Sequence, residues 1–461
     1  MISTEQYDIY RTKGMILLRR LLAAVLLLAV FPLVACRPVA QPPRPEAETV
    51  LASMLVSHLA SGQYALAVGM FDRTMLRQLP ASTLKAAWEN ATSPLGALQA
   101  HEPREKTPLG EHMVVLVDAS FAQGSMTVRV VFDASKSVAG LWFDNIQTAS
   151  RYQSPPYVDF TRFAEEPTTV GDGEWALPGT LTLPLGATVP VPAVVLVHGS
   201  GPQDRNSTIF DNKPFKDLAH GLASRGIAVL RYDKRTKVHG AKIQSESVTP
   251  HEETVEDAVL ALRLLLADSR IDSQRVYVLG HSLGGMLAPR IAELEPRTAG
   301  LILLAGAARP LGDLVLAQTE YLYNLDGELT SIERRHLQTI RAQVNRVKDP
   351  KLSARTRSDQ LPLGIPAAYW LWLRDYNPIN ILRKLQKPTF VLQGERDYQV
   401  TMDDFALWMS IGNPVEGRSY PHLNHLFMGG TGSPSPAEYE VPGNVAAEVI
   451  SDIAAWINRN F

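Results

Sequence analysis

The stretch RVYVLGHSLGGM, residues 275–286, has the form of a strand, a sharp turn and the start of a helix. Its apolar, β-branched first half predicts a buried strand. The pattern G-x-S-x-G follows, with Gly280 and Gly284 flanking Ser282. Small residues let the chain reverse tightly and hold the serine in a strained conformation with its hydroxyl exposed. We therefore interpret Ser282 as the nucleophile at an elbow between strand and helix.

Further predicted strands lie on both sides of this elbow and alternate with predicted helices. Val191–Val197 and 227–232 precede it, and Gly300–Leu304 and 388–392 follow it. Alternating strands and helices predict an α/β domain with a doubly wound, mostly parallel sheet and right-handed connections. We place this domain at about 155–461.

The interval of about 308–385 separates two of these strands and is too long for a loop. Its helical patterns predict a helical cap over the carboxyl edge of the sheet. Tyr369, Trp370, Trp372 and Tyr376 crowd the end of the interval. These aromatic side chains either line a pocket for an acyl chain or pack the core of the cap, and packing is the favoured interpretation.

Two polar loops follow later strands. Asp397, with Glu395 as a rival, lies after the strand 388–392, and His425, with His422 as a rival, lies after the predicted last strand. Loops at the carboxyl edge of a parallel sheet lie close together. We therefore expect a triad in the chain order Ser282, Asp397, His425.

His425 is preferred to His422 because the apolar residues that follow it can hold its ring. A general base must reach the serine hydroxyl while its other nitrogen faces the carboxylate, so only one of the two histidines is expected to fit.

Two backbone amides are candidates for an oxyanion hole. Leu283 begins the helix after the serine, so its N–H can point at a developing negative charge. Ser200 lies in the glycine-bracketed loop HGSGP, residues 198–202, directly after a predicted central strand. The alternative for this loop is a turn without a catalytic part. Asp204, Arg205 and Asn206 are expected only to fix its shape.

The composition is that of an ordinary globular protein. The 461 residues are 45% hydrophobic and 20% charged, which allows two or three domains. A formal net charge of −2 and the lack of a basic block argue against nucleic-acid partners. The single cysteine, Cys36, excludes an intramolecular disulfide and a cysteine-based zinc site.

A small α+β domain is expected at about 47–150. A helix over 46–61 and a second helix from Ser82 precede three β-rich runs at 112–121, 125–132 and 138–143. Residues from Leu79 to Gly96 resemble a domain of unknown function that often precedes secreted bacterial hydrolases, which implies a nuclear transport factor 2-like fold. The scattered histidines His58, His101 and His112 are interpreted as surface or core residues.

The first 36 residues have the form of an export signal. Arg19 and Arg20 precede an apolar run that is shorter than a membrane-spanning helix. Its end, Leu-Val-Ala-Cys36, resembles the lipobox of bacterial lipoproteins, which implies that Cys36 becomes the lipidated first residue. The alternative is a chance cysteine beside a membrane anchor. Translation from Met15 would give a signal of more usual length, and the Pro-rich stretch 37–46 is expected to be a stiff linker.

Five motifs in order carry a wider resemblance: HGSGPQDR, RYDKR, GHSLGG, QGERDYQV and LNHLF. Together they resemble the α/β-hydrolase superfamily, near secreted esterases related to dienelactone hydrolases and prolyl oligopeptidases. Together with the lipobox-like end of the signal, this resemblance implies an extracytoplasmic, lipid-anchored serine esterase that acts on small acyl esters and needs no cofactor. A thioesterase, an amidase or a peptidase would use the same residues. An inert binding lipoprotein is the alternative from another class.

The predicted anchor has a direct test. Cys36→Ser should abolish lipidation and release the folded domains in soluble form, because stable anchoring of this kind needs two or more acyl chains. Detergent phase partitioning of the two proteins measures the change. If Cys36→Ser still enters the detergent phase, an uncleaved membrane helix holds the protein instead.

Overall fold

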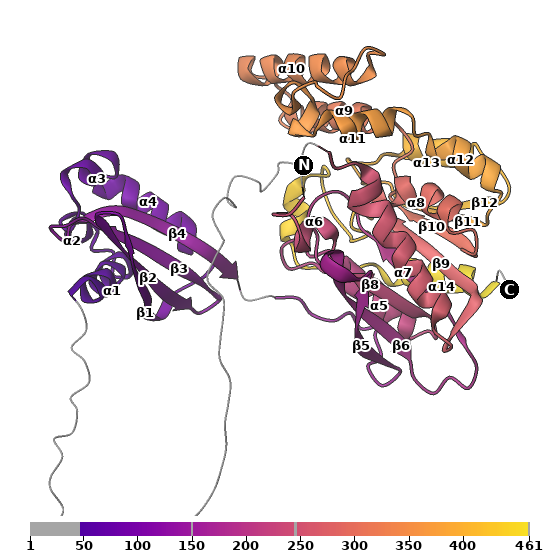
Figure 1. The fold of residues 1–461 in the computed structure, drawn as a ribbon, viewed down its shortest axis with the longest axis horizontal. Helices are drawn as coiled ribbons and strands as arrows, with labels where there is room; N and C mark the ends of the chain where they lie inside the picture. Colours follow the sequence, from indigo (N-terminus) through magenta and orange to yellow (C-terminus); the bar gives the residue numbers. More distant parts are fainter. Residues whose placement is uncertain (1–46, 149–150, 244–246, 460–461) are drawn as a thin grey trace, which may run out of the picture. The chain divides into compact units, whose positions relative to one another are not determined.

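The computed structural model describes residues 47–148, 151–243 and 247–459. The expected signal, Cys36 and the linker 37–46 lie outside these residues. The chain divides between Thr148 and Ala149 into two compact units (Figure 1). Among the described residues, no helix combines the length and the apolar character needed to cross a membrane.

The smaller unit consists of helices and an antiparallel meander with the strand order β1-β2-β3-β4. Its elements are α1 (Ala47–Ala60), α2 (Tyr64–Val68), α3 (Arg73–Gln78), α4 (Ala81–Thr92), β1 (Leu98–Leu109), β2 (His112–Phe121), β3 (Gly124–Phe132) and β4 (Val138–Thr148). Leu55 and Leu59 of α1 and Trp88 of α4 are buried with the inward side chains of the sheet. The Trp88 ring meets Phe143 edge-on at 5.5 Å.

Strand β1 was absent from the sequence-based prediction. It reads LQAHEPREKTPL, and its polar residues and two prolines are unfavourable for a central strand. The strand lies at the edge of the sheet and pairs only with β2, with an irregularity between Pro103 and Glu105. Proline and charged residues are tolerated on edge strands because one side of the strand needs no ladder partner.

The larger unit contains an eight-stranded sheet with the order β12-β11-β10-β9-β7-β8-β6-β5. Its strands are β5 (Phe163–Val170), β6 (Leu177–Pro184), β7 (Val191–Val197), β8 (Ala228–Tyr232), β9 (Ile271–His281), β10 (Gly300–Leu304), β11 (Thr389–Gly394) and β12 (Val415–Tyr420). Its α-helices are α5 (Pro214–Ala223), α6 (Arg235–Val238), α7 (Glu256–Ala267), α8 (Leu283–Leu294), α9 (Leu311–Tyr323), α10 (Ser331–Lys348), α11 (Ala367–Arg374), α12 (Pro378–Leu385), α13 (Met402–Met409) and α14 (Ala447–Arg459). The 3₁₀-helices η1 (Gly173–Trp175), η3 (Ser358–Gln360), η4 (Pro362–Gly364) and η5 (Pro436–Glu440) and the π-helix η2 (His251–Val255) complete it.

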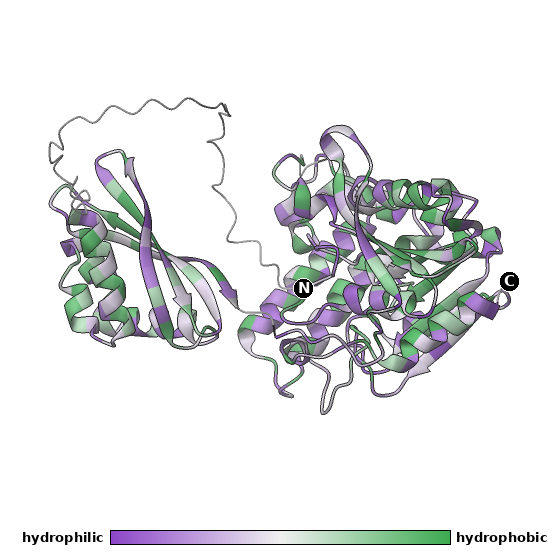
Figure 2. Ribbon diagram, turned by 90° about the horizontal axis from the view of Figure 1, so that it is seen from below, coloured by the Kyte–Doolittle hydropathy of each residue, from purple (hydrophilic) through white to green (hydrophobic). Residues whose placement is uncertain are grey.

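The predicted doubly wound, mostly parallel sheet is confirmed. The strands from β12 to β8 pair in parallel, whereas β6 and β5 add an antiparallel hairpin at one edge. Every residue of β7, β8 and β10 is buried, as expected for continuous apolar strands covered on both faces. Two hydrophobic clusters lie on the two faces of the sheet, and hydrophobic colour appears both on strands and on helices of the larger unit (Figure 2).

The segment expected as a cap is helical. It leaves the sheet after β10 and returns at β11 through α9, α10, α11 and α12, with α9, α10 and α11 close together in Figure 1. Buried Asp404 of α13 fixes its start, because its carboxylate accepts the backbone N–H groups of Ala308 and Arg309 at 2.9 Å each.

The aromatic residues at the end of this segment are mainly packed. Tyr369, Trp370 and Tyr376 are buried, and Trp370 lies in a small cluster with Val347 and Leu361. Trp372 is partly buried, and its ring lies beside that of Tyr376 in a tilted arrangement with centroids 5.0 Å apart. The burial of three of the four side chains supports the packing interpretation.

Truncating Trp370 should therefore destabilise the helical segment. We expect Trp370→Ala to lower the unfolding free energy by about 3–5 kcal/mol, because the large side chain leaves a cavity. Trp372→Ala, which removes a partly buried ring, is the matched control and should cost less. Thermal unfolding measures both. An unchanged melting temperature with a shifted acyl-chain preference would favour the pocket interpretation.

Candidate active site

The turn at Ser282 is forced by close backbone contacts. Ser282 has φ 56° and ψ −117°, a left-handed conformation that costs energy for a residue with a side chain. A methyl group at Gly280 would lie 2.3 Å from the Gly284 carbonyl oxygen, and one at Gly284 would lie 2.3 Å from the Val197 carbonyl oxygen. Only glycine fits at these two positions, so the motif allows β7, β9 and α8 to approach closely.

The elbow is also fixed by hydrogen bonds. The Ser282 N–H donates to the Leu304 carbonyl at 3.0 Å, at the carboxyl end of β10. The Ser282 carbonyl accepts the Met286 N–H at 3.0 Å and so begins α8. The serine is 8% exposed, at the edge where β7, β9 and β10 end.

Asp397 and His425 form a buried pair. His425 Nδ1 lies 2.6 Å from Asp397 Oδ2, and each residue is 4% exposed. The other carboxylate oxygen of Asp397 accepts the backbone N–H groups of Gln399 at 2.8 Å and Val400 at 3.0 Å. A carboxylate held in this way accepts the Nδ1 proton and leaves Nε2 of the imidazole as the basic nitrogen.

The two rival residues lie elsewhere. Glu395 is exposed and accepts the Ser419 hydroxyl at 2.7 Å. His422 is also exposed, and its carbonyl accepts the Gly430 N–H at 3.2 Å. The geometry therefore favours Asp397 and His425.

His281 supports the His425 backbone, a contact that sequence reasoning missed. Its Nε2 lies 2.8 Å from the His425 carbonyl oxygen, and the two rings are 4.6 Å apart. Burial lowers the pKa of His281 to about 3, and the neighbouring His425 adds to this effect. The ring is therefore neutral near pH 7 and donates its Nε2 proton to the carbonyl. The variable position of G-x-S-x-G gave no signal for this role.

The loop after β7 passes beside the serine. A methyl group at Gly199 would lie 3.1 Å from Ser282 Cβ and 3.6 Å from its Oγ. Leu283 is the first residue of α8, and Ser200 is partly exposed. Within the part of the chain that the structure describes, no protein acceptor pairs with the backbone N–H of either residue. Both amides are thus free to bind an oxygen atom of a ligand.

The polar residues of this loop fix its shape, as predicted. The Asp204 carboxylate accepts the backbone N–H groups of Asn206 and Thr208, and Arg205 pairs with Asp233 at 2.7 Å. His198 Nε2 lies 3.0 Å from the Asp204 carbonyl. Burial and the nearby Lys234 charge lower the pKa of His198 to about 3, so this ring is also a neutral donor.

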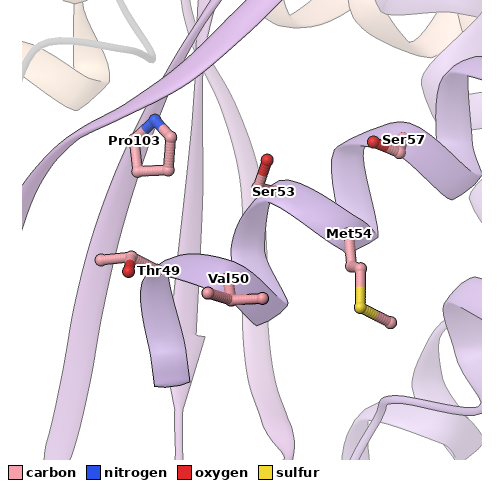
Figure 3. A pocket seen from close by; sticks show the side chains of 6 residues that line it. All are labelled: Thr49, Val50, Ser53, Met54, Ser57 and Pro103. Atoms are coloured by element: carbon pink, nitrogen blue, oxygen red, sulfur yellow. The ribbon is translucent and has the colours of Figure 1, made fainter. Parts of the chain in front are cut away.

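The smaller unit has a hollow on α1 and β1 with a volume of about 330 Å³ (Figure 3). It is lined by Thr49, Val50, Ser53, Met54, Ser57 and Pro103. Nearby, His101 bonds the Ser57 hydroxyl at 3.0 Å, and His58 bonds Gln63 at 2.8 Å.

In the described ranges of both units, no group of three His, Cys, Asp or Glu side chains is arranged to hold a metal ion.

Comparison with known families agrees with this fold. Residues 194–439 match the model of the alpha/beta hydrolase family, and residues 52–141 match that of a protein family of unknown function, DUF3887. The chain belongs to the alpha/beta hydrolase family, and the expected domain of unknown function precedes the hydrolase.

A relative is Esterase EstD of Thermotoga maritima, 37% identical over 412 residues, or 88% of this chain and 94% of EstD. The protein is a carboxylic ester hydrolase. Among solved structures, Est1E from Butyrivibrio proteoclasticus is 15% identical over 64% of this chain and 99% of its own, with a TM-score of 0.42. An esterase from the archaeon Pyrobaculum calidifontis is 18% identical over 64% and 85%, with a TM-score of 0.41. At these scores the structural similarity does not bear on function.

The two histidines of the last loop can be separated by mutation. His425→Ala should remove nearly all turnover and weaken fluorophosphonate labelling of Ser282. His422→Ala should cost less than about tenfold, or 1.4 kcal/mol, because its side chain is exposed. Ester hydrolysis and labelling of both variants decide the assignment. The reverse order of effects would move the base to His422.

Proposed function

We propose that this protein hydrolyses carboxylic esters through an acyl-enzyme, with Ser282 as the nucleophile, His425 as the general base and Asp397 as its partner. The observation that carries the proposal is the buried pair of His425 Nδ1 and Asp397 Oδ2 at 2.6 Å. A strained serine between two obligatory glycines supports it. The esterase named in the comparison is consistent with this chemistry.

In the first half of the reaction, Ser282 Oγ attacks the ester carbonyl carbon while His425 Nε2 takes the hydroxyl proton. The carbonyl oxygen becomes negative in the tetrahedral intermediate. The Leu283 and Ser200 N–H groups stabilise this charge as the oxyanion hole. The intermediate then collapses, the carbon–oxygen bond to the alcohol breaks, and His425 gives its proton to the leaving alcohol.

In the second half, water attacks the acyl-enzyme and His425 takes a proton from it. The second tetrahedral intermediate releases the carboxylic acid, and the Ser282 oxygen recovers its proton. Asp397 fixes the imidazole tautomer throughout and stabilises the imidazolium by its negative charge. Every step uses side chains and amides of this chain.

The substrate side of the proposal is a small acyl ester. A thioester or an amide would pass through the same intermediate, so rates on matched esters, thioesters and amides of graded acyl length define the leaving group. We further propose that the enzyme works outside the cytoplasm, anchored to a bacterial membrane through Cys36. The lipobox-like sequence and the Pro-rich linker support this location.

Loss of the nucleophile tests the proposal and its rival, an inert binding protein. Ser282→Ala should lower kcat by about 10⁴ to 10⁶, the range that follows loss of a triad serine. Fluorophosphonate should label the wild-type enzyme and leave the variant unlabelled, with unchanged circular dichroism as the control for folding. A variant that retains a tenth of the activity would contradict the proposal.

A further inference from the structure

Lys234 is a buried cation that the mechanism above does not use. It belongs to the RYDKR motif, follows β8 and is 2% exposed. Its Nζ donates to the Gly199 carbonyl at 2.8 Å and to Glu253 Oε1 at 2.5 Å. Its backbone N–H donates to the Gln203 carbonyl at 3.0 Å. Lys234 therefore holds the loop beside Ser282 at two points.

The contact with Gly199 has a consequence for the neighbouring amide. The Gly199 carbonyl and the Ser200 N–H belong to one peptide unit, which is trans. The C=O and N–H bonds of a planar trans peptide point in opposite directions. A bond that fixes the Gly199 carbonyl toward Lys234 thus turns the Ser200 N–H away from Lys234.

The next peptide is also fixed. The Ser200 carbonyl accepts the Gln203 side-chain amide at 3.0 Å. Both peptide units that meet at Ser200 thus have a bonded carbonyl, while the N–H of Ser200 has no acceptor among the described residues. In this arrangement, the Ser200 N–H of the loop beside Ser282 remains available to a ligand.

The Glu253 carboxylate that accepts from Lys234 is itself held by a hydrogen bond from α11. Glu253 is 9% exposed, and its Oε2 accepts the Tyr369 hydroxyl of α11 at 2.7 Å. Burial and the Glu253 charge raise the pKa of Tyr369 well above its usual range, so the phenol remains a donor. Hydrogen bonds therefore run without a break from Tyr369 of α11 through Glu253 and Lys234 to the Gly199 carbonyl.

We propose that Lys234 is a positioning residue for the oxyanion hole: its ammonium, held by Glu253, fixes the Gly199–Ser200 peptide so that the Ser200 N–H faces the oxyanion. The inference rests on the proposed function of Ser282. A charge-assisted bond is shorter and stronger than a neutral one. The positive charge also polarises the peptide, which makes the Ser200 N–H a stronger donor.

A neighbouring ion pair provides a matched control. Arg235 and Asp257 are 8% and 2% exposed, and Arg235 Nε donates to Asp257 Oδ2 at 3.0 Å. Arg235 is one residue after Lys234 and Asp257 is four residues after Glu253, and neither side chain bonds the 198–206 loop in the described structure. It resembles the Lys234–Glu253 pair in burial and charge but does not reach the oxyanion loop.

The test compares two double variants, because removal of one partner alone would strand a buried charge. Lys234→Met with Glu253→Gln removes the ammonium and keeps an acceptor for Tyr369. Arg235→Met with Asp257→Asn is the control. Measured quantities are the melting temperature, kcat and KM on a soluble ester, and Ki for a trifluoromethyl ketone, which forms a tetrahedral oxyanion on the serine.

We expect the Lys234 double variant to lose about 10- to 100-fold in kcat, with KM changed less than about threefold, because a misplaced donor weakens binding of the transition state alone. Ki for the ketone should rise by a similar factor. The control double variant should keep kcat within about threefold of the wild-type value, even if its melting temperature falls as much as that of the Lys234 double variant.

A folded Lys234 double variant with wild-type kcat and Ki would overturn the inference. Equal losses of kcat in both double variants would also overturn it, since they would indicate a purely structural role. Ser282→Ala, measured in parallel, separates this result from a failure of the proposed function. If Ser282→Ala stays active, the proposed function fails; if it is inactive and the Lys234 double variant is not impaired, only the positioning role fails.

Discussion

The close approach of three backbone segments at the elbow is the constraint on which the larger unit depends. Gly280 and Gly284 let α8 start directly against the ends of β9 and β7, at distances that exclude any side chain. The strained φ of Ser282 is the cost of this approach, and strain of this kind persists only where the surroundings hold it. Here the hydrogen bond to Leu304 and the fully buried strands on either side hold it.

Several charged and polar groups that are buried around this elbow have defined partners. Asp397 accepts from His425 and from two backbone amides, and Asp404 accepts from the start of the helical segment. Burial of such groups is costly unless they are paired, so the pairs restrict the loops to one arrangement. The neutral rings of His198 and His281 have the same effect, because each donates to a backbone carbonyl beside the serine. His425 differs from these two rings because its Nδ1 lies against a carboxylate oxygen, Oδ2 of Asp397.

The helical segment between β10 and β11 is both packed and connected to the site. Trp370 belongs to its own small core, whereas Tyr369 and Tyr376 reach out to Glu253 and to the Met286 carbonyl. The hydroxyls of these two tyrosines join α11 and the turn after it to η2 and to α8, the helix that follows Ser282.

The sequence alone predicted the mostly parallel sheet, the elbow and the triad candidates. Buried parallel strands appear in a sequence as continuous apolar runs, and the glycine spacing around Ser282 indicates a tight turn between strand and helix. It did not reveal β1, whose prolines and charges are tolerable only on an edge strand. The choice of His425 over His422 and of Asp397 over Glu395 rested on neighbouring residues alone. In the tertiary structure, His425 and Asp397 are buried and in contact through Nδ1 and Oδ2, whereas both rivals are exposed. The roles of His281 and Lys234 depend on carbonyls that are distant in the sequence, at His425 and Gly199, so no local pattern could predict them.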